Sequence, residues 1–413
     1  MTKKRLFVII ERGGDCMKIG VYQLTANNHQ QSLVEDRNNS FLKKIEQNSD
    51  IQFCPIEENG FFQYKFNVIF VRTGGTEALF LNIYQRLQGP FYLLTTGEFN
   101  SLAASMEILS FLKQKQEHAE IIHGNEQFIV QRLEKLYWDR ANYTEIIKAK
   151  LGVIGKPSDW LIASLVDYEV VKRKMGISLI DIELSELLEN MDQAEISTNP
   201  KIKQILQNKF DENTLVKALK LYQGLRMIID KYELSGLTIR CFDLLSSIQN
   251  TSCLGLALLN SDGFIGTCEG DIPAMLSMYI LREITGSSGF QANPVQINHD
   301  NNEIVFAHCT LPLSMTKKYT LMSHFESGLG VAIKGILPET TVTIFKIAHD
   351  LQKCFVSRGV ILENLNHTNL CRTQIRIKME KDVSYFLTEP LGNHHIIVLG
   401  DYVNLLEKYF MEL

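Results

Sequence analysis

The first 150 residues alternate between short apolar runs and amphipathic segments. Val68–Val71 is an uninterrupted apolar run, typical of a strand that is buried on both faces, and Phe91–Thr96 is a similar, mostly apolar run. A turn with glycine follows each run, at Arg72–Glu77 and at Gly97–Ser101, and a segment of helical periodicity follows each turn. Strand, turn and helix in repetition predict a parallel sheet with right-handed crossovers.

The same alternation continues from residue 151 to residue 300, with expected strands at 151–155, 177–182 and 236–241 and expected helices at 213–232 and 272–285. Beyond residue 300 the pattern changes to short strand-like runs between turn residues, which is typical of an antiparallel barrel or sandwich. These runs are Ile304–Ala307, Tyr319–Ser323, Gly330–Ile336, Val342–Ile347, Gly359–Asn364, Gln374–Lys378, Ser384–Thr388 and His395–Leu399. We therefore predict two doubly wound, Rossmann-like α/β domains with parallel sheets, residues 1–150 and 151–300, followed by a β-rich antiparallel barrel domain, residues 301–413.

Composition narrows the function classes. The chain has 413 residues, of which 45% are hydrophobic and 22% charged, as in ordinary soluble globular proteins of two or three domains. A net charge of -5 provides no basic excess for binding phosphates, so we expect no nucleic-acid partner. No apolar run approaches the roughly 18 residues that span a membrane, and Leu6–Ile10 is too short for a secretion signal. We therefore expect a cytoplasmic protein whose cysteines are reduced, with Cys268 and Cys309 packed as small hydrophobic residues.

Four polar residues in the last third of the chain are candidate metal ligands. Glu269, Asn293, His308 and His395 each lie where a predicted strand or helix begins or ends, which is where functional sites are commonly built. One carboxylate, one amide oxygen and two imidazoles suit Mn²⁺, with Mg²⁺ as the alternative. A carboxylate beside such a cation is suited to moving a hydrogen between C1 and C2 of a sugar.

The short motifs around these residues occur in a characteristic order: Cys268–Asp271, Ala307–Thr310, Ser323–Gly328, Cys371–Gln374 and Gly392–His395. In this order, and in its overall architecture, the chain resembles the superfamily of L-fucose and L-arabinose isomerases, and more closely its fucose isomerase-like branch. The resemblance implies two α/β domains followed by a β-rich domain, Mn²⁺ as the cofactor and the interconversion of aldoses and ketoses.

The resemblance also assigns roles to the candidate ligands. Glu269 matches the first metal-binding Glu of fucose isomerases, and Asn293 lies 293 − 269 = 24 residues further, where those enzymes have an Asp. His308 matches a ligand of arabinose isomerases. The doublet His394–His395 also resembles those enzymes, in which the second histidine binds the metal, and this favours His395.

Asn293 departs from the pattern of the family, because an amide can bind a metal but cannot accept a proton. Isomerisation would then depend on Glu269 as the single base, or on a substitute such as Asp271 or Glu326. Two alternatives follow: another metal-assisted carbohydrate reaction, such as that of an epimerase or a lyase, and a non-catalytic sugar-binding protein on the same fold.

Further candidates for contact with the substrate are Trp160, His324, Glu326 and Arg372, although each is also compatible with a structural role. Arg372 is a candidate for an anionic group such as a phosphate, carboxylate or sulfonate. By resemblance we expect a homo-oligomer, a trimer or a hexamer, in which the N-terminal domain of one subunit covers the site of a neighbour. The turns that contain Gly74, Gly75, Glu98 and Asn100 are the candidate covering surface.

Overall fold

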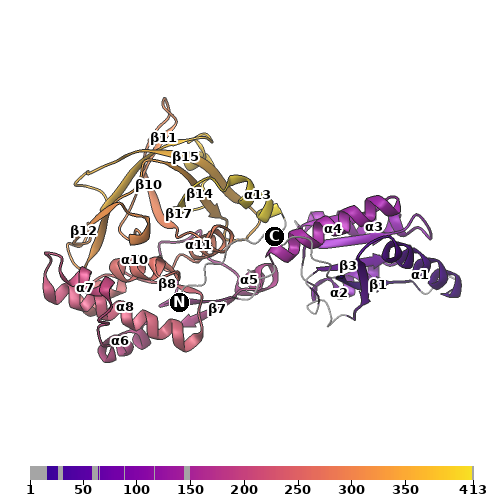
Figure 1. Ribbon diagram of the computed structural model, residues 1–413, viewed down its shortest axis with the longest axis horizontal. Helices are drawn as coiled ribbons and strands as arrows, with labels where there is room; N and C mark the ends of the chain where they lie inside the picture. Colours follow the sequence, from indigo (N-terminus) through magenta and orange to yellow (C-terminus); the bar gives the residue numbers. More distant parts are fainter. Residues whose placement is uncertain are drawn as a thin grey trace. The chain divides into compact units, whose positions relative to one another are not determined.

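The computed structural model describes residues 16–26, 31–57, 64, 66–87, 89–115, 117–143 and 149–411. The run Leu6–Ile10 lies outside the described residues. The chain divides into two compact units, the first extending to Ile147 and the second from Lys148 to Phe410 apart from residues 173–175 (Figure 1). No helix among the described residues has the length and apolar character needed to cross a membrane.

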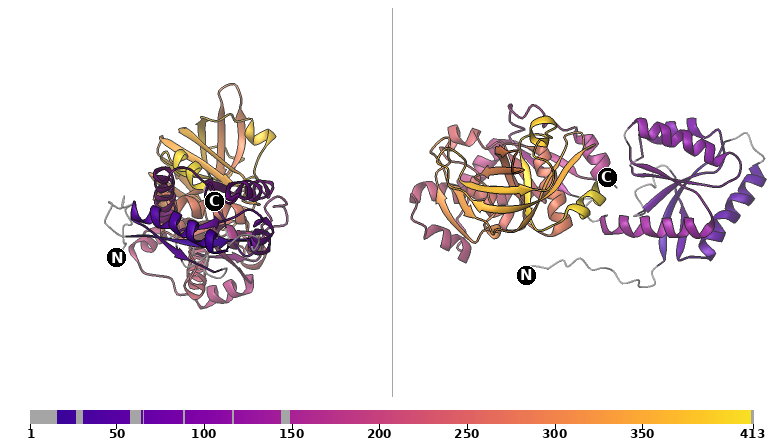
Figure 2. Two further views of the ribbon diagram at one scale, coloured as in Figure 1. Left: turned by 90° about the vertical axis from the view of Figure 1, so that its right-hand side faces the viewer. Right: turned by 90° about the horizontal axis from the view of Figure 1, so that it is seen from above.

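The first unit is built on a five-stranded parallel sheet with the order β2-β1-β3-β4-β5. Its strands are β1 (Met17–Leu24), β2 (Ile51–Pro55), β3 (Phe66–Val71), β4 (Phe91–Thr95) and β5 (Ala119–Ile122). Helices lie on both faces of this sheet, as Figure 2 shows: α1 (Gln31–Gln47), α2 (Glu77–Tyr84), α3 (Ser101–Gln114) and α4 (Glu126–Tyr143). Residues from Val68 to Val71 of β3 enter two separate hydrophobic clusters in alternation, which explains why this run is apolar without interruption.

The second unit begins with a four-stranded parallel sheet of order β7-β6-β8-β9. Its strands are β6 (Lys150–Ile154), β7 (Ser178–Ile182), β8 (Gly236–Ile239) and β9 (Ile265–Cys268). The helices of this part are α5 (Tyr168–Met175), α6 (Leu184–Gln193), α7 (Pro200–Leu206), α8 (Glu212–Tyr232), α9 (Asp243–Ile248), α10 (Cys253–Ser261) and α11 (Ile272–Thr285).

A closed antiparallel barrel follows, with the strand order β10-β11-β16-β15-β14-β17 (orange to yellow in Figure 1). Its strands are β10 (Phe290–Asn298), β11 (Glu303–His308), β14 (Thr341–Ile347), β15 (Cys354–Asn364), β16 (Thr373–Met379) and β17 (His395–Leu399). The hairpin β12 (Lys318–Met322) and β13 (Ala332–Ile336), the turn η3 (Leu313–Met315) and the helices α12 (Tyr385–Thr388) and α13 (Val403–Met411) complete the unit. The predicted fold class, parallel α/β sheets followed by an antiparallel barrel, is confirmed.

One expected strand is wrong. Residues 384–388 contain the single helical turn α12. Asp382 accepts a hydrogen bond from the amide of Ser384 at 2.8 Å, which caps the turn, and Phe386 packs edge-on against Phe306 and Phe355. Burial of one aromatic side chain against the barrel thus decided the conformation of a segment whose composition also suits a strand.

The parallel sheet and the barrel of the second unit share one hydrophobic cluster, which extends from Ile154 and Leu237 to Ile344 and Ile377. Helix α11 is buried along almost its whole length and contacts β8 and β9 of the sheet as well as β14 and β17 of the barrel. This shared packing brings the end of β9 to the barrel. A domain boundary at residue 300, between the central α/β domain and the barrel domain, stays a prediction.

Candidate active site

Glu269 lies at the carboxyl end of β9, in a tight turn that directs its side chain away from the sheet. Glu269 and Gly270 both adopt left-handed backbone angles, with φ of 67° and 69°. A Cβ atom at Gly270 would lie 2.6 Å from the carbonyl oxygen of Lys156, so only glycine fits there. The amide of Ser158 donates to the carbonyl of Glu269 at 3.1 Å, and the amide of Gly270 donates to that of Ile239 at 2.9 Å. A non-glycine residue in this conformation costs about 1–3 kcal/mol, and such strain is concentrated at functional sites.

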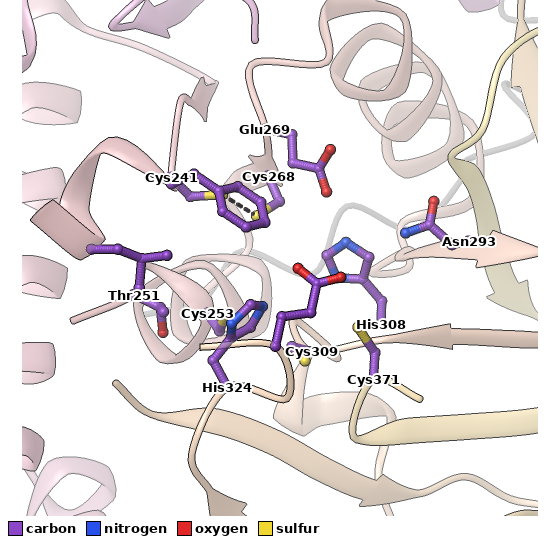
Figure 3. A pocket seen from close by; sticks show the side chains of 13 residues that line it. Cys241, Thr251, Cys253, Cys268, Glu269, Asn293, His308, Cys309, His324 and Cys371 are labelled. Atoms are coloured by element: carbon purple, nitrogen blue, oxygen red, sulfur yellow. Dashed lines mark hydrogen bonds between the residues drawn. The ribbon is translucent and has the colours of Figure 1, made fainter. Parts of the chain in front are cut away.

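His308 and Asn293 come from the barrel. His308 ends β11, and Asn293 lies in β10 opposite Ala307. The imidazole of His308 is 5% exposed, and its Nδ1 lies 3.0 Å from Oγ1 of Thr310. Figure 3 shows the side chains of Glu269, His308 and Asn293 pointing toward one space. The shared core of sheet and barrel thus brings together residues from two different sheets.

His394 completes this cluster from the loop before β17. Its Nδ1 lies 2.9 Å from Oδ2 of Asp271 and its Nε2 lies 3.4 Å from Oε1 of Glu269. Glu269, His308 and His394 each present one donor atom within 4.8 Å of the other two. Nε2 of His394 is buried, and within the part of the chain that the structure describes its partner is Glu269, at a distance that is long for a hydrogen bond.

His395, the residue that the resemblance favours as a ligand, faces a different environment. Its Nε2 lies 3.1 Å from the hydroxyl of Tyr385, and its ring packs against Phe306 and Phe386. His395 pairs with Ala292 in the ladder between β10 and β17, and side chains alternate along a strand, so consecutive histidines point to opposite faces. The structure therefore places His394, and not His395, beside Glu269 and His308.

The charges in the cluster stabilise one another. Burial alone would raise the pKa of Glu269, but a hydrogen bond and the charge of His394 outweigh it and lower this pKa to about 2. Burial disfavours the imidazolium of His394, yet its bonds to Asp271 and Glu269 raise its pKa to about 9. Burial lowers the pKa of His308 to about 4. These shifts make His394 cationic and His308 neutral at neutral pH.

Asp271 and Lys346 form a fully buried pair behind His394. The Lys346 ammonium lies 3.4 Å from Oδ2 of Asp271, and Oδ1 of Asp271 accepts the amide of Ala274 at 2.8 Å, capping α11. Despite burial, the charges of Lys346 and His394 hold the pKa of Asp271 well below its usual range. Our sequence reasoning did not identify this pair. The available signals were the capping position of Asp271 before Ile-Pro and the single charge in the apolar run of β14.

The cluster borders a cavity (Figure 3). Besides three members of the predicted site it is lined by apolar, thiol and polar side chains: Cys241, Phe242, Leu245, Thr251, Cys253, Cys268, Cys309, His324, Glu326 and Cys371. The thiols of Cys241 and Cys268 lie 2.9 Å apart. Cys268 and Cys309 are buried, so their expected packing agrees with the structure, although both also line the cavity.

The four further candidates have different positions. His324 and Glu326 line the cavity. Trp160 is 49% exposed, and its indole N–H donates to Oε2 of Glu269 at 2.9 Å. Arg372 donates through Nε to the carbonyl of Ser323 at 2.8 Å, so it supports the hairpin that carries His324 and Glu326. The turns with Gly74, Gly75, Glu98 and Asn100 belong to the first unit.

The residues of the cluster suit a divalent cation. Ligands about 2.0–2.3 Å from an ion lie within roughly 4.6 Å of one another, close to the observed spacing of the three donor atoms. Within the described residues Nε2 of His394 has only the long contact with Glu269 at 3.4 Å, so this nitrogen can also serve as a metal ligand. One carboxylate and two imidazoles, with an amide nearby, are ligand types that divalent cations take in proteins.

Comparison with known proteins gives relatives of one kind. The chain is 25% identical over 345 residues to the sulfoquinovose isomerase of Priestia megaterium (strain ATCC 12872 / QMB1551), covering 76% of each protein. It is 24% identical over 321 residues to the sulfoquinovose isomerase of Alkalicoccus urumqiensis, covering 74% of this chain and 72% of the relative. A match to the sulfoquinovose isomerase of Clostridium sp. (strain MSTE9) is 26% identical and covers 50% of this chain. No protein-family model matches the chain.

Proposed function

We propose that this protein is a metal-dependent sugar isomerase that interconverts an aldose and a ketose. The observation that carries the proposal is the convergence of Glu269, His308 and His394, the first two of which line one cavity, in a chain whose relatives are named as isomerases of a sugar. The assignment to the fucose isomerase-like branch stays a prediction.

Glu269, His308 and His394 are the residues that would hold Mn²⁺ or Mg²⁺, with Asn293 as a further oxygen ligand. This set replaces His395 by His394, for the geometric reason given above. When bound, the cation supplies positive charge that stabilises the oxygen anion formed as the sugar loses its C2 proton.

Glu269 is also the proposed base. Its carboxylate is ionised throughout the physiological range and can therefore accept the proton from C2 and return it to C1. Trp160 and His394 hold its two oxygens in place, at 2.9 Å and 3.4 Å. Gly270 cannot change without displacing the loop at Lys156, so the backbone behind the base is rigid.

The substrate class is a free aldose, and sulfoquinovose is the first sugar to test because it appears in the names of the relatives. The test incubates the protein with Mn²⁺ in D₂O and sulfoquinovose, L-fucose or L-arabinose, and follows the sugars by NMR. Ketose formation together with deuterium at C2 is the expected result. Absence of both from every sugar would rule out the proposal.

A second candidate is another reaction that begins by removing the C2 proton, such as epimerisation, or a lyase reaction. Asn293 motivates it, because Asn293 lines the cavity in the place of a second carboxylate. Deuterium at C2 with formation of a C2 epimer or a cleavage product, and no ketose, would favour this alternative. Binding of a sugar without any exchange would instead favour the non-catalytic alternative.

The cytoplasmic location and the homo-oligomeric state, a trimer or a hexamer, stay predictions. A mass in solution by light scattering that equals the 47.1 kDa of one chain would contradict the oligomer.

A further inference from the structure

We infer that Glu326 is a second catalytic residue, which carries the hydroxyl proton between O2 and O1 of the sugar. This inference rests on the proposed isomerase reaction. Conversion of an aldose to a ketose moves one proton from C2 to C1 and a second proton from O2 to O1. C1 is reduced and C2 is oxidised by the same two electrons, so no external oxidant or reductant is needed. Glu269 accounts for the first proton, and the second also needs a carrier.

Two other polar side chains near Glu269, those of Asn293 and Asp271, cannot carry this second proton. Asn293 lines the cavity, but its amide does not accept a proton. Asp271 is 0% exposed and does not line the cavity. Its two oxygens are already engaged by His394, Lys346 and the amide of Ala274. Asp271 therefore acts on the structure of the site and not on the sugar.

Glu326 lines the same cavity as Glu269 and is the other carboxylate among the described residues that do so. Cys371 also lines the cavity, and the charges of both Glu326 and Glu269 act on its thiol. Its thiol pKa is raised by a hydrogen bond to Cys309, by burial and by the charge of Cys309, and further by the charges of Glu326 and Glu269. The two carboxylates thus act on one side chain of the wall. Glu326 is exposed, so a proton that it carries can exchange with water.

The loop that carries Glu326, residues 323–331 between β12 and β13, is internally bonded. The amide of His324 donates to the carbonyl of Leu329 at 2.8 Å, and the amide of Gly328 donates to the carbonyl of His324 at 2.9 Å. The ring of His324 lies 3.1 Å from the hydroxyl of Ser327 and meets Phe242 edge to face at 5.8 Å. Arg372 holds the start of the loop through Ser323. These bonds order the backbone of the loop that carries Glu326.

The experiment separates the two protons. In wild type with Mn²⁺ and whichever of sulfoquinovose, L-fucose or L-arabinose it converts, ketose formation and exchange of C2 hydrogen for deuterium are both measured in D₂O. In Glu326→Gln, Glu269 still removes the C2 proton, but no side chain moves the hydroxyl proton from O2 to O1. The intermediate therefore returns to the aldose. We expect ketose formation to fall on the order of 10²-fold. Deuterium exchange into the recovered aldose should stay within about threefold of wild type, because Glu269, which removes the proton from C2 and returns it, is unchanged.

Two controls sharpen the result. Glu339→Gln removes an exposed carboxylate from the turn at the far end of β13 and should change neither rate. Formate should restore ketose formation in Glu326→Ala, because a small carboxylic acid can replace the missing proton carrier, and it should have no effect on Glu269→Gln.

Three outcomes would overturn the role of Glu326. Retention of both rates in Glu326→Gln would show that no proton depends on it. Loss of both rates with unchanged Mn²⁺ affinity would show that it does not act selectively on the hydroxyl proton. Absence of both rates from wild type with all three sugars would remove the isomerase proposal itself, and the role of Glu326 with it.

Discussion

The two parallel sheets of this protein use the carboxyl ends of their strands in different ways. At the edge of the first sheet, polar side chains bond to the backbone: Oγ1 of Thr73 accepts the amide of Ala26 at 3.0 Å, and the hydroxyl of Ser101 donates to the carbonyl of Val71. At the edge of the second sheet, Glu269 bonds to Trp160 and lies beside two imidazoles at a cavity. The same edge of the same sheet type thus supports turns in one unit and a candidate site in the other.

This difference shows that strand-end position is not sufficient for a site. The second sheet has a barrel packed against it through α11, and the barrel supplies His308, Asn293 and His394. At the first sheet, Thr73 and Thr76 bond to backbone groups of that edge instead of facing a partner domain. Each prediction below tests whether the two edges differ in this way.

The largest expected effect is on turnover. Glu269→Gln keeps the shape of the side chain and one ligating oxygen, but the amide cannot accept the C2 proton. We expect kcat to fall on the order of 10²-fold or more, with the folded structure and much of the Mn²⁺ binding retained. Steady-state kinetics, circular dichroism and Mn²⁺ titration measure the three quantities. Full turnover in this variant would contradict the assignment of the base.

The histidine doublet gives a paired test. His394→Ala removes a proposed ligand, so Mn²⁺ affinity should fall at least about 100-fold, because loss of even an outer partner costs about 10–100-fold. His395→Ala should leave the affinity within a few-fold and lower the melting temperature instead, since it empties a place in the aromatic cluster. Calorimetric titration and thermal unfolding distinguish them, and the reverse ranking would restore His395 as the ligand.

The buried pair behind His394 should matter for both stability and metal binding. In Asp271→Asn the hydrogen bond to His394 loses its charge, and we expect about 10–100-fold weaker Mn²⁺ binding. Lys346 is then left as an uncompensated buried charge, which destabilises a protein by about 3–5 kcal/mol. Adding Lys346→Met should recover the stability but not the affinity. Recovery of both would show that the pair serves only folding.

Metal binding should depend on pH with a known sign. Neutral imidazole binds a metal, and His394 has a pKa raised to about 9 in the metal-free protein. Below pH 9 the metal must therefore displace one proton, and affinity should rise about tenfold per pH unit up to that value and then level off. The pKa values of His308 and Glu269, about 4 and 2, lie below this window and add nothing to the slope. Titration in buffers of different ionisation enthalpy measures the released proton, and a flat profile from pH 6 to 9 would exclude His394 as a ligand.

The smallest effect is expected at the first sheet. Thr73→Val preserves the size of the side chain but leaves the amide of Ala26 without its acceptor, which costs about 1–3 kcal/mol. Urea unfolding should show this loss, while Mn²⁺ affinity should equal that of wild type because the proposed ligands belong to the second unit. A change in affinity would show that the two sheet edges are coupled.

Much of the fold and part of the candidate site followed from the sequence. Apolar runs such as Val68–Val71 predicted parallel sheets, because strands that are buried on both faces are apolar at every position. The change of pattern after residue 300 predicted a barrel, because strands with one buried face are short and alternate between apolar and polar positions. The positions of Glu269, Asn293 and His308 at element ends predicted that they border one site, and the structure brings them to one cavity. Trp160, a weaker candidate for contact with the sugar, donates a hydrogen bond to Glu269, and its contact with a sugar stays a prediction.

The sequence by itself determined the residue types of the site and the elements that carry them, since local periodicity and turn chemistry are properties of neighbours along the chain. Only the tertiary structure decided between His394 and His395, paired Asp271 with Lys346 across 75 residues, and placed Glu326 at the same cavity as Glu269. The physical reason is that strand register selects which of two consecutive side chains faces Glu269 and His308. Burial then makes an unpaired charge so costly that distant partners must meet.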